Sequence, residues 1–268
     1  MKAAFFAVFL AAGIALFPAI AEETTIIQIP AGEIFSGIKI NAAATDAGIT
    51  IVPAGPGETA VLQMREVKGG MRFSGGTLII EVQPNKILRR IFNLGIDWHG
   101  RVDTHQEITL RLPLNSLDSV DLETGNGAIS LEDMSFTGGT LVTSNGAIRL
   151  ENTNFSGGSL TTINGAIRLT DTGWDTLNAR SSNGAVDISG GRAGNGSTSV
   201  RSSNGRVHLG ILGDEDDFSY TITTGNGSIE VNGERQRGTN RVSGGNGAHR
   251  IRIQTSNSRA NLEFEKEF

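Results

Sequence analysis

The sequence predicts an all-β, single-domain protein of the β-solenoid (β-helix-like) class, and three observations support this. The dipeptide Asn-Gly recurs at a nearly fixed interval, and apolar residues keep a constant position relative to it. Glycine is frequent, at 36 of 268 residues, and proline is scarce, at 6. A period of about 20 residues is typical of stacked repeats, in which each unit forms one coil.

The Asn-Gly repeat defines a common frame in which each asparagine is position 0. The predicted corners are separated by 19 to 22 residues and consist of Asn126, Gly127, Asn145, Gly146, Asn164, Gly165, Asn183, Gly184, Asn204, Gly205, Asn226 and Gly227. Positions +3 and +5 are always apolar, which is the period of a half-buried strand. Position −2 is always Thr or Ser.

Each unit is therefore a short strand, an Asn-Gly corner and a second strand. Because Asn and Gly reach positive φ at the lowest cost, we expect positive φ at these corners. A meander of hairpins or a barrel is the alternative, but different turns would then alternate at intervals of roughly 8–12 residues. The same corner returns once per 19 to 22 residues, which favours one full coil of a solenoid.

Aromatic residues form a second stripe at position +10, namely Phe136, Phe155 and Trp174. We expect these rings to stack in the core, and the alternative is a surface platform for sugar rings. The glycine pairs at 138–139 and 157–158 are expected to make the next corner of the coil.

The repeat changes near its end, where the sequence around Gly245–Gly247 does not keep the apolar positions. A frame centred on Asn257 fits better, because Ala260 and Leu262 then occupy positions +3 and +5. This frame predicts about seven coils, with residues 232–247 as a loop inserted into the last one.

The N-terminal part divides into a targeting segment and a cap. Residues 1–21 resemble a secretory signal peptide cleaved near Ala21, because a charged start, an apolar run and a small-x-small site follow one another. An uncleaved anchor is the alternative. Residues 22–113 are predicted to form an N-terminal β cap, with strands at 24–29, 48–52, 77–82 and 107–112, and residues 114–268 the Asn-Gly solenoid.

Two segments depart from this pattern. Residues 86–101 mix apolar and basic side chains and are interpreted as a hairpin arm or loop, or as an amphipathic element that touches lipid or a partner. Residues 214–217 read Asp-Glu-Asp-Asp, for which a solvated loop is favoured over a calcium site because no known calcium-binding spacing is present.

Composition narrows the functional classes. The chain has no cysteine, so neither disulfides nor a lipid-modified cysteine contribute. Its net charge of −5 does not favour nucleic acid as a partner. No other apolar stretch is long enough to cross a membrane, so we expect no transmembrane segment in the mature chain and a periplasmic, secreted or cell-surface location.

The repeat unit Thr143–Leu150, with the sequence Thr-Ser-Asn-Gly-Ala-Ile-Arg-Leu, resembles the bacterial adhesin-like family of β-strand repeats called the toastrack domain. The strand that ends at Leu112-Pro113 and the glycine-rich segment Gly244–Gly247 are also similar to that family. The resemblance covers roughly residues 24–264. It implies a β-helix-like extracytoplasmic protein without established enzymatic activity, and it carries over no catalytic residue.

The residues themselves predict no catalytic site, cofactor or metal centre. The four histidines are scattered, and position +4, which should face outward, mixes both charges. Arg149 and Arg168 would lie on neighbouring coils there, as possible contacts for a carboxylate or phosphate. We therefore expect a non-enzymatic, adhesin-like protein that binds a glycan, peptide or envelope component. A β-helix polysaccharide lyase or hydrolase and an envelope-stress sensing module are the alternatives.

Overall fold

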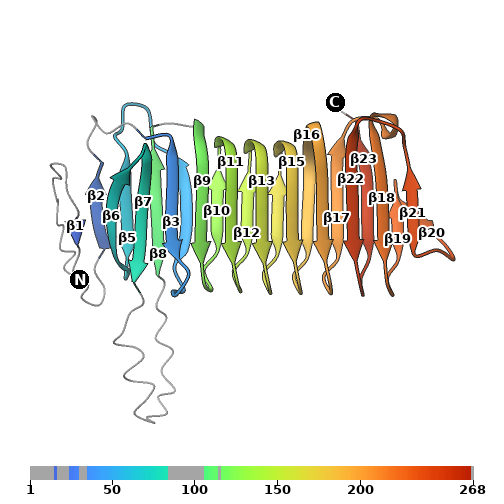
Figure 1. Ribbon diagram of the computed structural model, residues 1–268, viewed down its shortest axis with the longest axis horizontal. Helices are drawn as coiled ribbons and strands as arrows, with labels where there is room; N and C mark the ends of the chain where they lie inside the picture. The colour runs from blue at the N-terminus through green and yellow to red at the C-terminus, as the bar shows by residue number, and fades with distance from the viewer. Residues whose placement is uncertain (1–14, 17–23, 30–34, 84–105, 114–115, 267–268) are drawn as a thin grey trace, which may run out of the picture.

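The protein is an elongated stack of β coils, seen in a computed structural model that describes residues 15–16, 24–29, 35–83, 106–113 and 116–266 (Figure 1). Strands run across the long axis, and the described part contains one short 3-10 helix, η1 (Glu215–Asp217). The predicted all-β solenoid is confirmed. Apart from Ala15–Leu16, the predicted signal peptide lies outside the described residues, as does segment 86–101.

Each coil gives one strand to each of two sheets. Sheet A is ordered β2 (Thr24–Gln28), β5 (Val61–Arg65), β8 (Glu107–Leu112), β4 (Gly48–Pro53), β10 (Ile129–Glu132), β12 (Ile148–Glu151), β14 (Ile167–Thr170), the first part of β16 (Val186–Ser202), β17 (Val207–Leu212), β23 (Ala260–Glu265), β19 (Ile229–Val231) and β20 (Glu234–Gln236).

Sheet B runs alongside in the corresponding order. Its strands are β1 (Ala15–Leu16), β6 (Lys68–Ser74), β7 (Thr77–Gln83), β3 (Gly37–Ala42), β9 (Ser116–Thr124), β11 (Ser135–Thr143), β13 (Asn154–Thr162), β15 (Gly173–Ser181), the second part of β16, β22 (His249–Thr255), β18 (Phe218–Thr224) and β21 (Arg241–Gly244). The four strands expected before residue 113 are confirmed as β2, β4, β7 and β8, and β1, β3, β5 and β6 were not predicted.

The core lies between the two sheets. Alternate residues point inward, so Ile148 and Leu150 of β12 are buried and Arg149 between them is exposed. Parallel pairing places Ile148 beside Ile167 and Leu150 beside Leu169. Equivalent apolar positions therefore form continuous columns, and their burial is the main driving force for stacking.

The coils do not stack in chain order at either end. The coil of β3 and β4 lies between that of β7 and β8 and that of β9 and β10. The coil of β22 and β23, the last along the chain, lies between β16–β17 and β18–β19 (Figure 1). We call these two the intercalated coils. Residues 232–247, predicted to be a loop, instead contain β20 and β21, which pair antiparallel at the end of the stack.

An asparagine ladder follows the corners that join sheet B to sheet A. The side-chain amide nitrogen of each corner asparagine donates to the side-chain oxygen of the corner residue on the neighbouring coil. Asn164 donates to Asn145 at 2.5 Å, and Asn183 donates to Asn164 at 2.7 Å. Asn257 donates to Asn204 at 2.7 Å and accepts from Asn226 at 3.1 Å. At its other end the ladder runs through Asn126 to Asp46 of the β3–β4 connection.

The expectation of positive φ at these corners is wrong. Positive φ occurs at the opposite corner, at position +7, where Asp133, Asn152 and Asp171 have φ of 53°, 47° and 50°. Glycine is needed after the corner asparagine because the coils approach closely there. A Cβ built on Gly146 would lie 1.8 Å from the carbonyl oxygen of Gly127 in the preceding coil.

A ladder of buried hydroxyls supports the same corners from inside. The Thr162 hydroxyl donates to the carbonyl of Gly146 at 3.1 Å and accepts from the amide of Gly165 at 3.1 Å. Ser181 repeats the arrangement one coil further on. The Thr or Ser at position −2 thus satisfies backbone groups of two coils, because a buried polar group left unpaired is costly.

The aromatic stripe is in the core, as expected. The ring centroids of Phe136 and Phe155 are 5.1 Å apart, and those of Phe155 and Trp174 are 6.4 Å apart. The glycine pairs at 138–139 and 157–158 were wrongly predicted to form a corner, since they lie inside β11 and β13. Gly158 gives room to a ring, because a Cβ there would lie 2.6 Å from Phe155.

Candidate ligand-binding faces

The outer face of sheet A carries the row of side chains predicted at position +4. Strand register places its members on successive coils in the order Ser130, Arg149, Arg168, Asp187, His208, Asn261 and Glu230. The intercalated coil of β22 and β23 places Asn261 between His208 and Glu230. The order of residues along the chain did not predict this neighbour. Neighbouring members are about 4.8 Å apart at the backbone, the usual strand spacing.

Arg149 and Arg168 lie side by side on β12 and β14. Both are exposed, and neither is in an ion pair or side-chain hydrogen bond within the described part of the chain. The residues two positions before them, Ala147 and Ala166, carry only short side chains. The pair is a place where two guanidinium groups can be offered to one anionic ligand.

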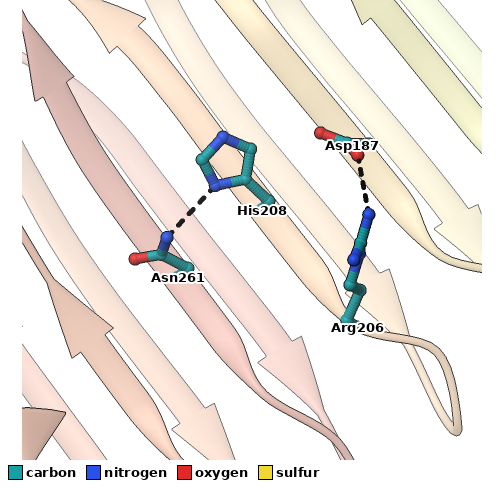
Figure 2. Close-up of polar contacts among 4 residues, drawn as sticks. All are labelled: Asp187, Arg206, His208 and Asn261. Atoms are coloured by element: carbon teal, nitrogen blue, oxygen red, sulfur yellow. Dashed lines mark hydrogen bonds and ion pairs between the residues drawn. The ribbon is translucent and has the colours of Figure 1, made fainter. Parts of the chain in front are cut away.

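The remaining charged members of the row already have partners. Arg206 Nη2 lies 3.2 Å from Asp187 Oδ2, and Asn261 Nδ2 lies 3.2 Å from His208 Nδ1 (Figure 2). Glu230 is 3.5 Å from Arg259. Glu230 lies three strand spacings from Asp187, or about 14 Å. These two carboxylates are too far apart to act together on one glycosidic bond.

A carboxylate pair missed at the sequence level lies beside the arginines. Glu132 and Glu151, at position +6, are register partners on β10 and β12, and both are exposed. Reading position +4 alone overlooked them, although the frame places both on the same face. Their neighbouring backbones are close enough for a two-carboxylate arrangement on the outer face of sheet A.

The acidic segment 214–217 has a structural role. Asp214 is the N-cap of η1, in which Glu215 accepts from the Tyr220 hydroxyl at 2.6 Å and from the Asn232 side-chain amide at 3.1 Å. Burial and the neighbouring Glu215 raise the pKa of Tyr220 to about 12. In the part of the chain that the structure describes, no three His, Asp or Glu side chains are arranged to hold a metal ion.

His249 is buried at the start of β22. Trp174 Nε1 donates to the Thr198 hydroxyl at 2.7 Å, and that hydroxyl is 2.9 Å from His249 Nε2. His249 Nδ1 lies 2.7 Å from the carbonyl of Gly194. The consistent assignment is a neutral ring with the proton on Nδ1, and burial lowers the pKa of His249 below 6.5. This network joins β22 of the intercalated coil to β15 and β16.

An open hollow of about 520 Å³ runs along the edges of the aromatic stack, between Ser135 and Arg192. Phe136, Phe155 and Trp174 contribute to its floor but are only 3–5% exposed. A sugar-stacking platform needs exposed ring faces, which these residues do not offer. Among the described residues no helix is long and apolar enough to span a membrane.

The family model described as Toastrack DUF4097 matches residues 4–262. Among solved structures, a "putative adhesin" from Bacteroides fragilis is similar, with a TM-score of 0.51 and 12% identity over 89% of this chain and 95% of that one. A "putative lipid binding protein" from Parabacteroides distasonis has a TM-score of 0.47 and 14% identity, over 90% and 96% of the two chains. No curated protein matches the chain in sequence. The likeness to the Bacteroides fragilis protein supports the fold.

Proposed function

The chain belongs to the Toastrack DUF4097 family, and we propose that it is a non-enzymatic, adhesin-like binding protein of the cell envelope or surface. In this proposal residues 1–21 direct export and are removed near Ala21. Residues 22–113 and 114–268 then act together as one domain, without a cofactor. The ligand is a macromolecule, whether glycan, peptide or another envelope component, held on an outer face.

The observation that carries the proposal is the uncovered arginine pair on sheet A. Arg149 and Arg168 lie on adjacent coils and have no anionic partner within the described residues. Guanidinium groups bind carboxylates and phosphates through paired hydrogen bonds. On the same row, Asp187 and Glu230 are ion-paired with Arg206 and Arg259, which offsets their charges.

The test combines a binding array of glycans, peptides and envelope extracts with a turnover screen on the same samples. We expect binding without turnover, and an affinity about tenfold or more weaker when Arg149→Ala and Arg168→Ala are combined. Arg111→Ala is the matched control, since Arg111 is an exposed arginine of the same sheet on β8. Turnover that disappears in the double variant would refute the non-enzymatic proposal.

A second candidate function, a polysaccharide lyase or hydrolase, is favoured by one observation, the neighbouring Glu132 and Glu151 beside Arg149. A pair of carboxylates can supply acid and base to a glycosidic bond. For an enzyme, Glu132→Gln or Glu151→Gln would abolish turnover of an acidic polysaccharide. For a binding protein, both variants have no turnover to lose and retain the ligand.

A further inference from the structure

Five arginines gather on the outer face of sheet B, on the face opposite to Arg149 and Arg168. This arginine patch comprises Arg180 on β15, Arg201 on β16, Arg250 and Arg252 on β22, and Arg241 on β21. The patch exists because the intercalated coil brings β22 beside β16. In chain order β22 would lie one coil further from Arg180 and Arg201, on the far side of β18, so the repeat frame alone did not reveal the patch.

Strand register fixes how these arginines are arranged. Arg180 and Arg201 are direct partners on adjacent coils, about 4.8 Å apart at the backbone. The other register neighbours are neutral side chains with hydroxyl or amide groups, as follows: Thr161 beside Arg180, Gln254 beside Arg201, Ser197 and Ser219 beside Arg250, Ser199 and Thr221 beside Arg252, and Thr223 beside Arg241. The patch is therefore a basic area set in uncharged hydrogen-bonding groups.

No member of the patch is in an ion pair within the described residues. The Nε atom of Arg201 is buried and has no hydrogen-bond partner. Like charges on adjacent coils repel each other, so Arg180 and Arg201 raise the free energy of the isolated protein. A bound anion would remove this repulsion and give the guanidinium groups the acceptors that they lack.

We infer that the arginine patch binds an acidic polysaccharide, through its carboxylate or sulfate groups. Guanidinium groups can donate paired hydrogen bonds to the oxygens of a carboxylate or sulfate. The surrounding Ser, Thr and Gln side chains can exchange hydrogen bonds with the hydroxyl groups of the sugars. Arg250 and Arg252 follow one another along a strand, two residues or about 7 Å apart. An extended polymer laid along β22 therefore meets a charge at each of these positions and at Arg201 beside it.

Other polyanions fit this face less well. Single-stranded nucleic acid is held mainly by base stacking on aromatic side chains, and the outward positions of these fully described strands carry none. An anionic bilayer is flat and would cover the whole sheet. It would then meet exposed Asp121 and Glu123 of β9, four coils or about 19 Å from β16. A narrow chain that crosses the stack avoids these carboxylates.

The experiment measures binding of the full exported chain to polygalacturonate and heparin at low salt. Dextran is the uncharged control, and vesicles of phosphatidylglycerol and duplex DNA are the competing polyanions. We expect both acidic polysaccharides to bind, with affinity that falls as salt is added, and dextran not to bind. Arg201→Ala combined with Arg252→Ala should weaken binding about tenfold or more. Arg250→Ala with Arg252→Ala repeats the test at fully outward positions, and thermal melting checks that each variant is folded.

The sheet A variant Arg149→Ala/Arg168→Ala separates this inference from the function proposed above, which rests on the other face. Polysaccharide binding that survives in this variant and is lost in the patch variants supports the inference. The reverse pattern overturns it and leaves the proposed function standing. The inference also fails if neither acidic polysaccharide binds, or if vesicles or DNA bind and the polysaccharides do not.

Discussion

Adding a single methyl group at Gly165 is predicted to destabilise the stack. A Cβ there would lie 1.7 Å from the carbonyl oxygen of Gly146 and 2.4 Å from its carbonyl carbon, and real Cβ atoms do not come within 3.0 Å of such atoms. The two coils must separate by about 1.3 Å, more than a quarter of the usual strand spacing. Both obstacles are backbone atoms, so no side-chain rotation can relieve the overlap.

The cost follows from the bonds beside the corner. The backbone amide of Asn164 donates to the carbonyl of Ser144, and that of Ile148 donates to the carbonyl of Ala166, each at 2.9 Å. A separation of the two coils by about 1.3 Å breaks both hydrogen bonds. Two lost hydrogen bonds cost about 2 kcal/mol together, and residual overpacking costs about 1 kcal/mol or more. Replacing glycine by alanine also lowers the conformational entropy of the unfolded chain, which offsets roughly 0.4–1 kcal/mol of this loss of stability. Gly165→Ala should therefore cost about 2 kcal/mol, or a fall in Tm of roughly 4–8 °C for a chain of this size.

Thermal and urea unfolding followed by circular dichroism measure this change. Gly138→Ala is the matched control, because Gly138 lies in the same stack and a Cβ there meets nothing within 4 Å. We expect the control to melt at or slightly above the wild-type temperature. If the two variants melt together, close contact between coils is not the reason for glycine at the corners.

Three further predictions concern the interior. Thr162→Val should cost about 1–3 kcal/mol in urea unfolding because it leaves two backbone groups unpaired, whereas Thr161→Val on the outer face should cost less than about 0.5 kcal/mol. The lowered pKa of His249 means that the unfolded state binds the proton first, so stability should fall as pH drops below 6.5. His249→Phe should flatten this slope, and an unchanged slope would contradict the assignment to His249. Ending the chain after residue 248 should expose β17 to protease and hydrogen exchange, and unchanged protection there would contradict an interior position for β22 and β23.

The periodic part of the fold could be predicted from sequence because each coil has inward apolar and outward polar residues at the same positions. Ile148 and Leu150 must point inward, Arg149 must point outward, and the asparagine frame places all three. The same frame identified Asn257 despite the serine that follows it. The reason for glycine at the corner was missed, because φ is a property of one residue, whereas the closeness of Gly146 to Gly127 belongs to two coils.

Coil order could not be predicted, because equivalent coils carry equivalent patterns. Any unit with apolar residues at positions +3 and +5 can pair with any other, so nothing local tells Ala260 to pair with Val207 and Ile229 rather than lie beyond both. The choice is made by distant contacts, among them His249 with Thr198. The arginine patch and the neighbours of His208 depend on the order of the coils, so they could not be predicted from the sequence either.

The intercalated coil of β22 and β23 also bears on how the protein can be made. In a simple solenoid each new coil docks on the one before it as the chain emerges, so folding can follow synthesis or export from one end. Here β18 and β19 emerge before their inner neighbour exists, and they can reach their final place only when later residues arrive to separate them from β17. The stack can therefore be completed only after nearly the whole chain has been synthesised or exported. A partly exported chain lacks an interior coil rather than an end coil. The same arrangement limits how the family member can grow, because another repeat cannot simply be appended after β23.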